Sequence, residues 1–263
     1  MEEDSKKWLW WGIPVVVAVG LAAALYYGRK HKEEPVAVEQ VREEPVATVT
    51  DGPANHPIES DTSNAAPLPA LAQSDAAMKD SLAGVFGRSL EQFLVPRDLV
   101  RHMVATIDNL PRKKVAMQTW PLLPTTGKPV VTSEGETITW SNENLARYAP
   151  LMGVVRNTDT KQVAAVYKRY YPLFQQAYTE LGYPDGYFNN RLVEVIDHLL
   201  QAPDVQGPVE LTQPGVFYQF ADPTLEERSA GQKLLIRMGS DNAAAIKLKL
   251  RELRREIAKQ GAA

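Results

Sequence analysis

The most strongly patterned part of the chain is an uninterrupted apolar run over residues 8–27, from Trp8 to Tyr27. None of its twenty residues is charged. At a helical rise of about 1.5 Å per residue they span about 30 Å, which is the thickness of a bilayer's hydrocarbon core. Three tryptophans lie at one end and two tyrosines at the other, as expected at two membrane–water interfaces. The pattern predicts one transmembrane helix with the lipid bilayer as its partner.

The same run also fits a cleavable signal peptide, with Ala22, Ala23 and Ala24 as a small-residue cleavage site. The acidic residues at positions 2–4 and the length of the run favour a retained anchor, which we place at residues 1–32 with its charged flanks. Two basic residues precede the run and three follow it, a nearly balanced count that by itself leans toward a cytoplasmic C-terminal domain. The short N-terminal tail favours a C-terminal domain outside the cytoplasm.

Residues 33–68 have a different pattern, without aromatic residues and with prolines at five positions. Eight acidic residues stand against Arg42 alone, a net charge of −7. Such a segment cannot bury enough apolar surface to offset the entropy of ordering. We therefore predict a disordered tether between the anchor and a globular domain.

From residue 69 to about 260, apolar positions recur with the helical period. The pattern predicts a mainly α domain, with a small β-hairpin over 128–140 and an extended piece over 216–220. Pro172 lies inside one predicted helix, where we expect a kink or a break. The predicted helices are 75–85, 97–110, 142–152, 159–181, 187–200, 223–238 and 241–259.

Composition narrows the chemistry of this domain. The chain has no cysteine, which excludes disulfides and thiolate sites. No phosphate-binding glycine loop, nucleophile elbow or zinc spacing occurs. The sequence therefore predicts no catalytic residue, metal site or cofactor, and we expect no nucleic-acid partner because residues 69–263 carry a net charge of only +2.

Most of the tyrosines, with several amides, gather about the turn at 182–186. Such clusters can hold a glycan or a peptide. They can also pack two helices together with the hydroxyls at the rim, and the sequence favours this packing interpretation over a groove. The candidate binding residues are Tyr167, Tyr171, Gln175, Tyr178, Tyr183, Asp185, Tyr187, Asn190 and Arg191.

Acidic residues near the same turn offer weaker alternatives. Glu194, Asp197 and His198 share one helical surface and could form part of a metal site, although a solvated face is the favoured interpretation. Glu180 and Asp185 flank the turn and could form a carboxylate pair for acid–base chemistry, although capping and solvent contact are favoured.

Five segments together resemble a known family. They are Leu68–Asp75, Phe93–Pro96 with Asp108–Pro111, Tyr171–Pro184 and Ala230–Gly239. They are similar to a family of Gram-negative bacteria catalogued as domain of unknown function 3014, and the resemblance covers about residues 68–257. It implies a membrane-anchored, envelope-facing protein of unassigned activity and supplies no catalytic residues.

Two hypotheses follow for function. The first is a single-pass protein of the bacterial inner membrane whose C-terminal domain is periplasmic and binds an envelope protein or a cell-wall component without catalysis. The alternative is an envelope enzyme that acts on glycan or peptide through Glu180, Asp185 or Glu194.

Overall fold

The computed structural model describes residues 55–58, 67–124 and 128–258. All described residues belong to one unit of the chain, Val49–Ala263. The predicted membrane helix and residues 33–54 and 59–66 of the predicted tether lie outside the described residues. Among the helices that are described, none combines the length and the apolar character needed to cross a membrane.

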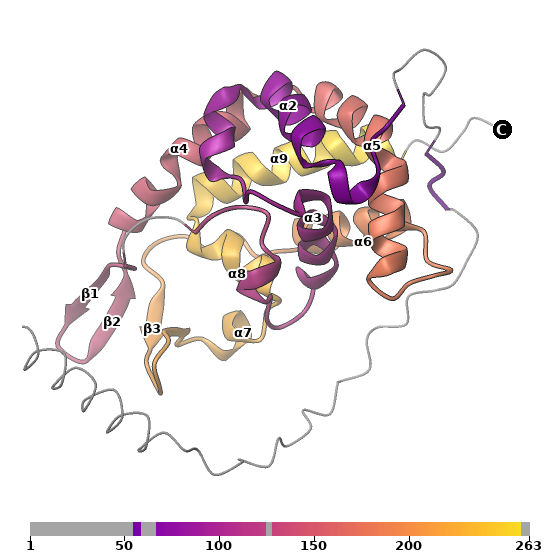
Figure 1. Ribbon diagram of the computed structural model, residues 1–263. Coiled ribbons are helices and arrows are strands. Elements are labelled where there is room, and N and C mark those ends of the chain that lie inside the picture. Colours follow the sequence, from indigo (N-terminus) through magenta and orange to yellow (C-terminus); the bar gives the residue numbers. More distant parts are fainter. Residues whose placement is uncertain (1–54, 59–66, 125–127, 259–263) are drawn as a thin grey trace, which may run out of the picture. The chain divides into compact units, whose positions relative to one another are not determined.

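The unit Val49–Ala263 is a mainly helical domain with a small antiparallel sheet (Figure 1). Its α-helices are α2 (Asp75–Phe86), α3 (Leu99–Asn109), α4 (Glu143–Asn157), α5 (Thr160–Glu180), α6 (Phe188–Leu200), α7 (Pro223–Glu226), α8 (Ala230–Arg237) and α9 (Ser240–Ile257). Short 3-10 turns are η1 (Leu71–Gln73), η2 (Arg88–Phe93) and η3 (Met117–Thr119), and the strands are β1 (Val131–Glu134), β2 (Thr137–Trp140), β3 (Glu210–Thr212) and β4 (Gln219–Phe220).

Side-chain caps explain where several helices begin. Asp159 accepts a hydrogen bond from the Lys161 amide at the start of α5, 2.9 Å away. The predicted helix over 223–238 is wrong as a single element. It is divided into α7 and α8, because Ser229 caps α8 by accepting a hydrogen bond from the Gln232 amide.

Of the kink or break predicted at Pro172, the structure decides the question of a break. Helix α5 runs without interruption through this proline, so no break occurs. The Pro172 ring lies on the exposed side of the helix, where solvent can satisfy the carbonyl that loses its amide partner.

The predicted hairpin is confirmed, and the sheet extends beyond it. Strand β1 pairs with β2 from Val131 opposite Trp140. Strand β3 adds to β2, with Leu211 opposite Ile138, and β4 adds to β3. Leu211 and Phe220 are buried against Ile236 of α8, so one face of the sheet packs on a helix.

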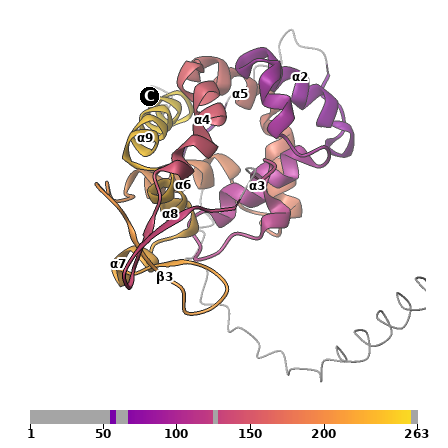
Figure 2. The same cartoon turned by 90° about the vertical axis from the view of Figure 1, so that its left-hand side faces the viewer.

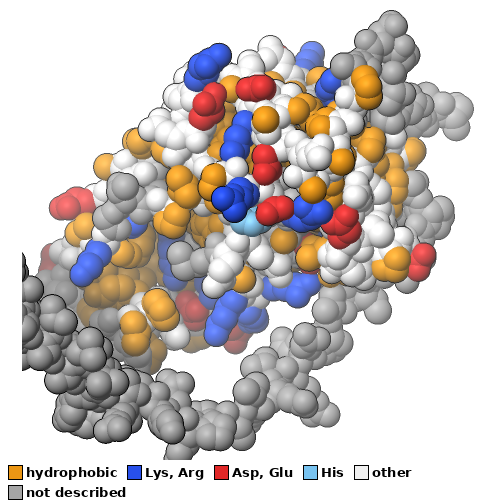
Figure 3. All heavy atoms as spheres, in the orientation of Figure 1, with side chains coloured by type: hydrophobic (Ala, Val, Ile, Leu, Met, Phe, Trp, Pro, Cys, Tyr) orange, Lys and Arg blue, Asp and Glu red, His pale blue; other side chains and the backbone are white. Residues whose placement is uncertain are grey.

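The main core lies between α2, α3, α5 and α6. Tyr178, Phe188, Leu99 and Ile196 are among its most deeply buried side chains. Helix α9 contacts α4, α5, α6 and α8. Figure 2 shows α9 on one side of α5 and α2 on the other. On the face seen in Figure 3, basic and acidic side chains are interspersed, without a patch of one sign.

Candidate binding site

The aromatic residues predicted as a binding surface lie mainly inside the domain. Tyr167, Tyr171 and Tyr178 on α5 are buried. The Phe174 and Phe188 rings stack with centroids 5.9 Å apart, and those of Tyr178 and Tyr183 stack at 4.5 Å. These rings therefore join α5 to the turn and to α6.

Residues at the start of α6 form hydrogen bonds with a distant part of the chain, residues 55–58. The Asn190 Oδ1 accepts a hydrogen bond from the His56 amide at 3.1 Å, and the Tyr187 hydroxyl accepts one from the Ile58 amide at 2.8 Å. The Asn189 Nδ2 donates to the His56 carbonyl at 2.8 Å. All three contacts are to main-chain atoms. We call Tyr187, Asn189 and Asn190 the amide surface.

The amide surface is fixed from behind by further hydrogen bonds. Asn189 is fully buried; its Oδ1 accepts from the Tyr167 hydroxyl at 3.1 Å, and its Nδ2 also donates to the Ile257 carbonyl at 3.0 Å. Burial raises the pKa of the Tyr167 hydroxyl far above its ordinary value, so this hydroxyl stays protonated as a donor. These buried partners therefore fix the orientation of the Asn189 side chain.

Gln175 fixes the turn between α5 and α6. Its Nε2 donates to the Gly186 carbonyl at 2.7 Å, and its Oε1 accepts from the Phe188 amide and the Tyr171 hydroxyl at 2.9 Å. A Cβ atom at Gly186 would lie 2.8 Å from the Tyr178 ring, so the turn approaches α5 too closely for a side chain at this position.

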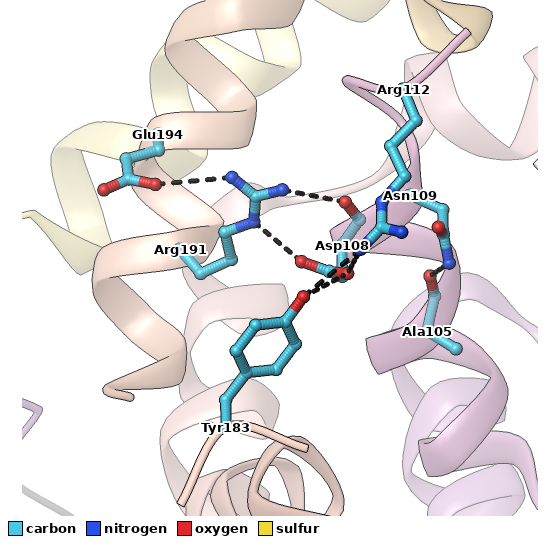
Figure 4. Close-up of polar contacts among 7 residues, drawn as sticks. All are labelled: Ala105, Asp108, Asn109, Arg112, Tyr183, Arg191 and Glu194. Carbon is cyan, nitrogen blue, oxygen red and sulfur yellow. Dashed lines mark hydrogen bonds and ion pairs between the residues drawn. The ribbon is translucent and has the colours of Figure 1, made fainter. Parts of the chain in front are cut away.

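A second polar cluster surrounds Asp108, which is only 1% exposed at the end of α3. Arg191 donates from Nε to its carboxylate and from Nη2 to its carbonyl, both at 2.9 Å. Arg112 and the Tyr183 hydroxyl donate to the other carboxylate oxygen at 2.8 and 3.2 Å. Figure 4 shows Arg191 and Tyr183 converging on Asp108 from α6 and from the turn.

The Asp108 cluster joins two predicted site residues, Tyr183 and Arg191, to two residues that the prediction missed, Asp108 and Arg112. Burial and the negative charge of Asp108 raise the pKa of Tyr183, which keeps its hydroxyl protonated. The one signal for Asp108 was its place in the segment Asp108–Pro111 that carried the family resemblance. Nothing local to that segment pointed to Arg191.

The remaining predicted residues are placed as follows. Asp185 is exposed in the turn. Glu180 pairs with Arg101 at 2.9 Å, and this hydrogen bond lowers the pKa of the carboxyl group. A carboxylate held ionised in this way is a poor proton donor near neutral pH. Binding of a ligand by the nine residues named from the sequence stays a prediction.

The three residues weighed as metal ligands face different partners. Glu194 lies 3.5 Å from Arg191, Asp197 pairs with Arg254 on α9, and the His198 Nε2 lies 2.8 Å from the Ser229 Oγ. Within the described ranges, no group of three or more His, Asp or Glu side chains is placed to hold a metal ion.

His198 makes a testable contribution to the pH dependence of stability. Burial, with Arg191 and Arg228 nearby, lowers its pKa, so the unfolded chain binds more protons than the folded chain between the lowered value and the ordinary value of about 6.5. We therefore expect the free energy of unfolding to fall as pH decreases below about 6.5. Denaturation curves of His198→Gln should show a shallower fall over this interval, and an unchanged slope would contradict the assignment.

Comparison with known proteins supports the family suggested by the sequence. Residues 99–254 match the family described as protein of unknown function (DUF3014). Three of the segments noted above, Asp108–Pro111, Tyr171–Pro184 and Ala230–Gly239, lie within this match, whereas Leu68–Asp75 and Phe93–Pro96 precede it. A search of curated proteins and a search of solved structures found no significant match. Because the match covers more than half of the sequence, the chain belongs to the DUF3014 family.

Proposed function

We propose that this chain is a single-pass membrane protein whose helical domain binds an extended segment of an envelope protein at the amide surface. The observation that supports this proposal is a set of hydrogen bonds from residues 55–58 to Tyr187, Asn189 and Asn190. Since all three contact main-chain atoms, the same donors and acceptors would suit an extended segment of another sequence.

The fit of the chain's own segment is incomplete. The Nδ1 atom of His56 is buried and has no hydrogen-bond partner among the described residues. A buried polar atom without a partner costs free energy. A segment with a different side chain at this position would avoid that cost and could displace residues 55–58.

The anchored arrangement is supported by the sequence alone. The twenty uncharged residues 8–27 have the length needed to span a bilayer. The acidic segment that follows has the composition of a flexible linker to a domain beside the membrane. We propose the bacterial inner membrane as the location, with the C-terminal domain in the periplasm.

The binding proposal is tested with a fluorescent peptide of residues 53–60 and the full chain in lipid nanodiscs. In a deletion variant that lacks residues 55–58, the main-chain atoms that occupy the amide surface are removed, and the surface should be free. We expect the peptide to bind this variant at least about tenfold more tightly than the wild type, because the internal competitor is gone. Fluorescence anisotropy measures both affinities.

A control adds Asn190→Ala and Tyr187→Phe to the deletion variant. These changes remove two of the three main-chain contacts and leave the buried Asn189 in place, so peptide binding should be lost while the circular dichroism spectrum is kept. Absence of peptide binding to the deletion variant would contradict the proposal. The same assay with a cell-wall peptide distinguishes the two classes of envelope partner.

The anchor is tested separately by alkaline extraction of membranes. The full chain should stay with the membrane pellet, and a variant without residues 8–27 should not. Release of the wild-type chain into the supernatant would contradict anchoring, and the peptide assay would then be run with the full chain in solution. Reporter fusions at the C-terminus then determine on which side of the membrane the domain lies.

A further inference from the structure

An apolar cavity of about 350 Å³ lies among α2, α3, α4, α5 and α9. Its walls include Leu82 of α2, Val166 and Phe174 of α5, and Leu253 of α9. The one hydroxyl in the lining belongs to Tyr167, and this hydroxyl is already bonded to Asn189. All other lining side chains are hydrocarbons or thioethers, so the cavity offers almost nothing to a polar ligand.

A cavity of this size and composition favours an apolar occupant. Protein interiors are close-packed, and an empty apolar cavity costs stability in proportion to its volume. A cavity of about 150 Å³ lined by similar side chains stays free of water and binds benzene. The cavity described here is more than twice that size, so it has room for a larger hydrocarbon group.

The surroundings of the cavity indicate that the occupant carries a polar end. A neighbouring hollow of about 360 Å³ shares three lining residues with the cavity: Val85, Phe86 and Val154. All three are half-buried, which places them between the interior and the surface. Unlike the cavity, this hollow is also lined by polar side chains, those of Ser89, Asn157 and Thr158. The lining side chains therefore change from apolar in the interior to partly polar at the surface.

We propose that the cavity binds the alkyl chain of a single-chain amphiphile whose polar head lies in the neighbouring hollow beside Ser89 and Asn157. The apolar lining excludes water from the alkyl chain, and the polar hollow keeps the head hydrated. This site is separate from the main-chain contacts of Tyr187 and Asn190. It also gives the aromatic residues Tyr167 and Phe174 of α5 a place in ligand binding.

The test uses the full chain in lipid nanodiscs and a fatty acid that carries a photoreactive diazirine at the end of its chain. After illumination, digestion and mass spectrometry should locate the label on the cavity-lining parts of α2 and α5. Two further arms use a lysophospholipid and a singly acylated lipopeptide with the same photoreactive chain. Labelling of the cavity by any of the three supports the proposal, and the strongest arm identifies the source of the chain.

Matched variants separate specific binding from contact with the bilayer. Val166→Phe fills the cavity from α5 and should lower labelling of α2 by about tenfold or more, which corresponds to about 1.4 kcal/mol or more of binding free energy. Ala165→Phe adds the same ring at an exposed position of the same helix and should leave labelling unchanged. Val163→Phe is a second filling variant in case the first does not fold, as judged by circular dichroism. Absence of cavity labelling in all three arms, or equal labelling of folded filled variants and wild type, would overturn the proposal.

Discussion

Replacement of Arg191 by methionine is expected to lower the free energy of unfolding by about 3–5 kcal/mol. Arg191 is mostly buried, with 12% of its side chain exposed, and it faces an Asp108 side chain that is 2% exposed. Methionine keeps much of the packing but removes two hydrogen bonds to Asp108. The Asp108 carboxylate then keeps only Arg112, which is 44% exposed, and the Tyr183 hydroxyl as partners. Chemical denaturation followed by circular dichroism measures the loss.

Two controls show whether the loss arises from a buried charge. Arg255→Met makes the same change at an exposed position of α9 and should alter stability by less than about 0.5 kcal/mol. In the double variant Asp108→Asn with Arg191→Met, both charges are removed, so the loss should be smaller than the sum of the two single losses. Additive losses, or a single loss no larger than that of Arg255→Met, would show that Asp108 does not depend on Arg191.

The second large effect is expected at Gly231, where alanine should destabilise the domain by about 1–3 kcal/mol. A Cβ atom at Gly231 would lie 2.5 Å from the Leu199 Cδ2 atom and 3.1 Å from the Leu110 carbonyl oxygen. The Gly231 amide also donates to this carbonyl at 2.9 Å. The Leu199 side chain would have to shift within the core, and α8 would have to move slightly away from the Leu110 carbonyl at the end of α3. Thermal unfolding should register the loss as a lower melting temperature.

Gly84 provides the matched control for this prediction. It lies in helix α2, and an added Cβ atom would meet nothing within 4 Å. Gly84→Ala should therefore stabilise the domain by about 0.5–1 kcal/mol, since alanine loses less backbone entropy in a helix than glycine does. If both substitutions shifted stability in the same direction, the close approach of α8 would not be the cause.

Local pattern was enough to predict most of the helices and one part of the sheet. In α6, the apolar spacing identified Leu192, Val195, Ile196 and Leu199, all of which are buried. The hairpin of β1 and β2 was also predictable from local pattern, because its two strands are adjacent along the chain. Strand β3 was missed. It is three residues long and pairs with β2, more than seventy residues earlier, so no local alternation indicates it.

The candidate sites likewise combine features that local sequence indicates with contacts between residues far apart in the chain. The amino-acid pattern alone indicated which residues are apolar, where most of the helices run, that tyrosines and amides gather about one turn, and that residues 8–27 suit a bilayer. It could not determine that Asp108 meets Arg191, 83 positions away, or that His56 meets Asn190, 134 positions away. Periodicity reports which face of a helix is apolar but does not identify the element that covers it. Those contacts and the apolar cavity arise from long-range packing, which brings these distant segments into one core.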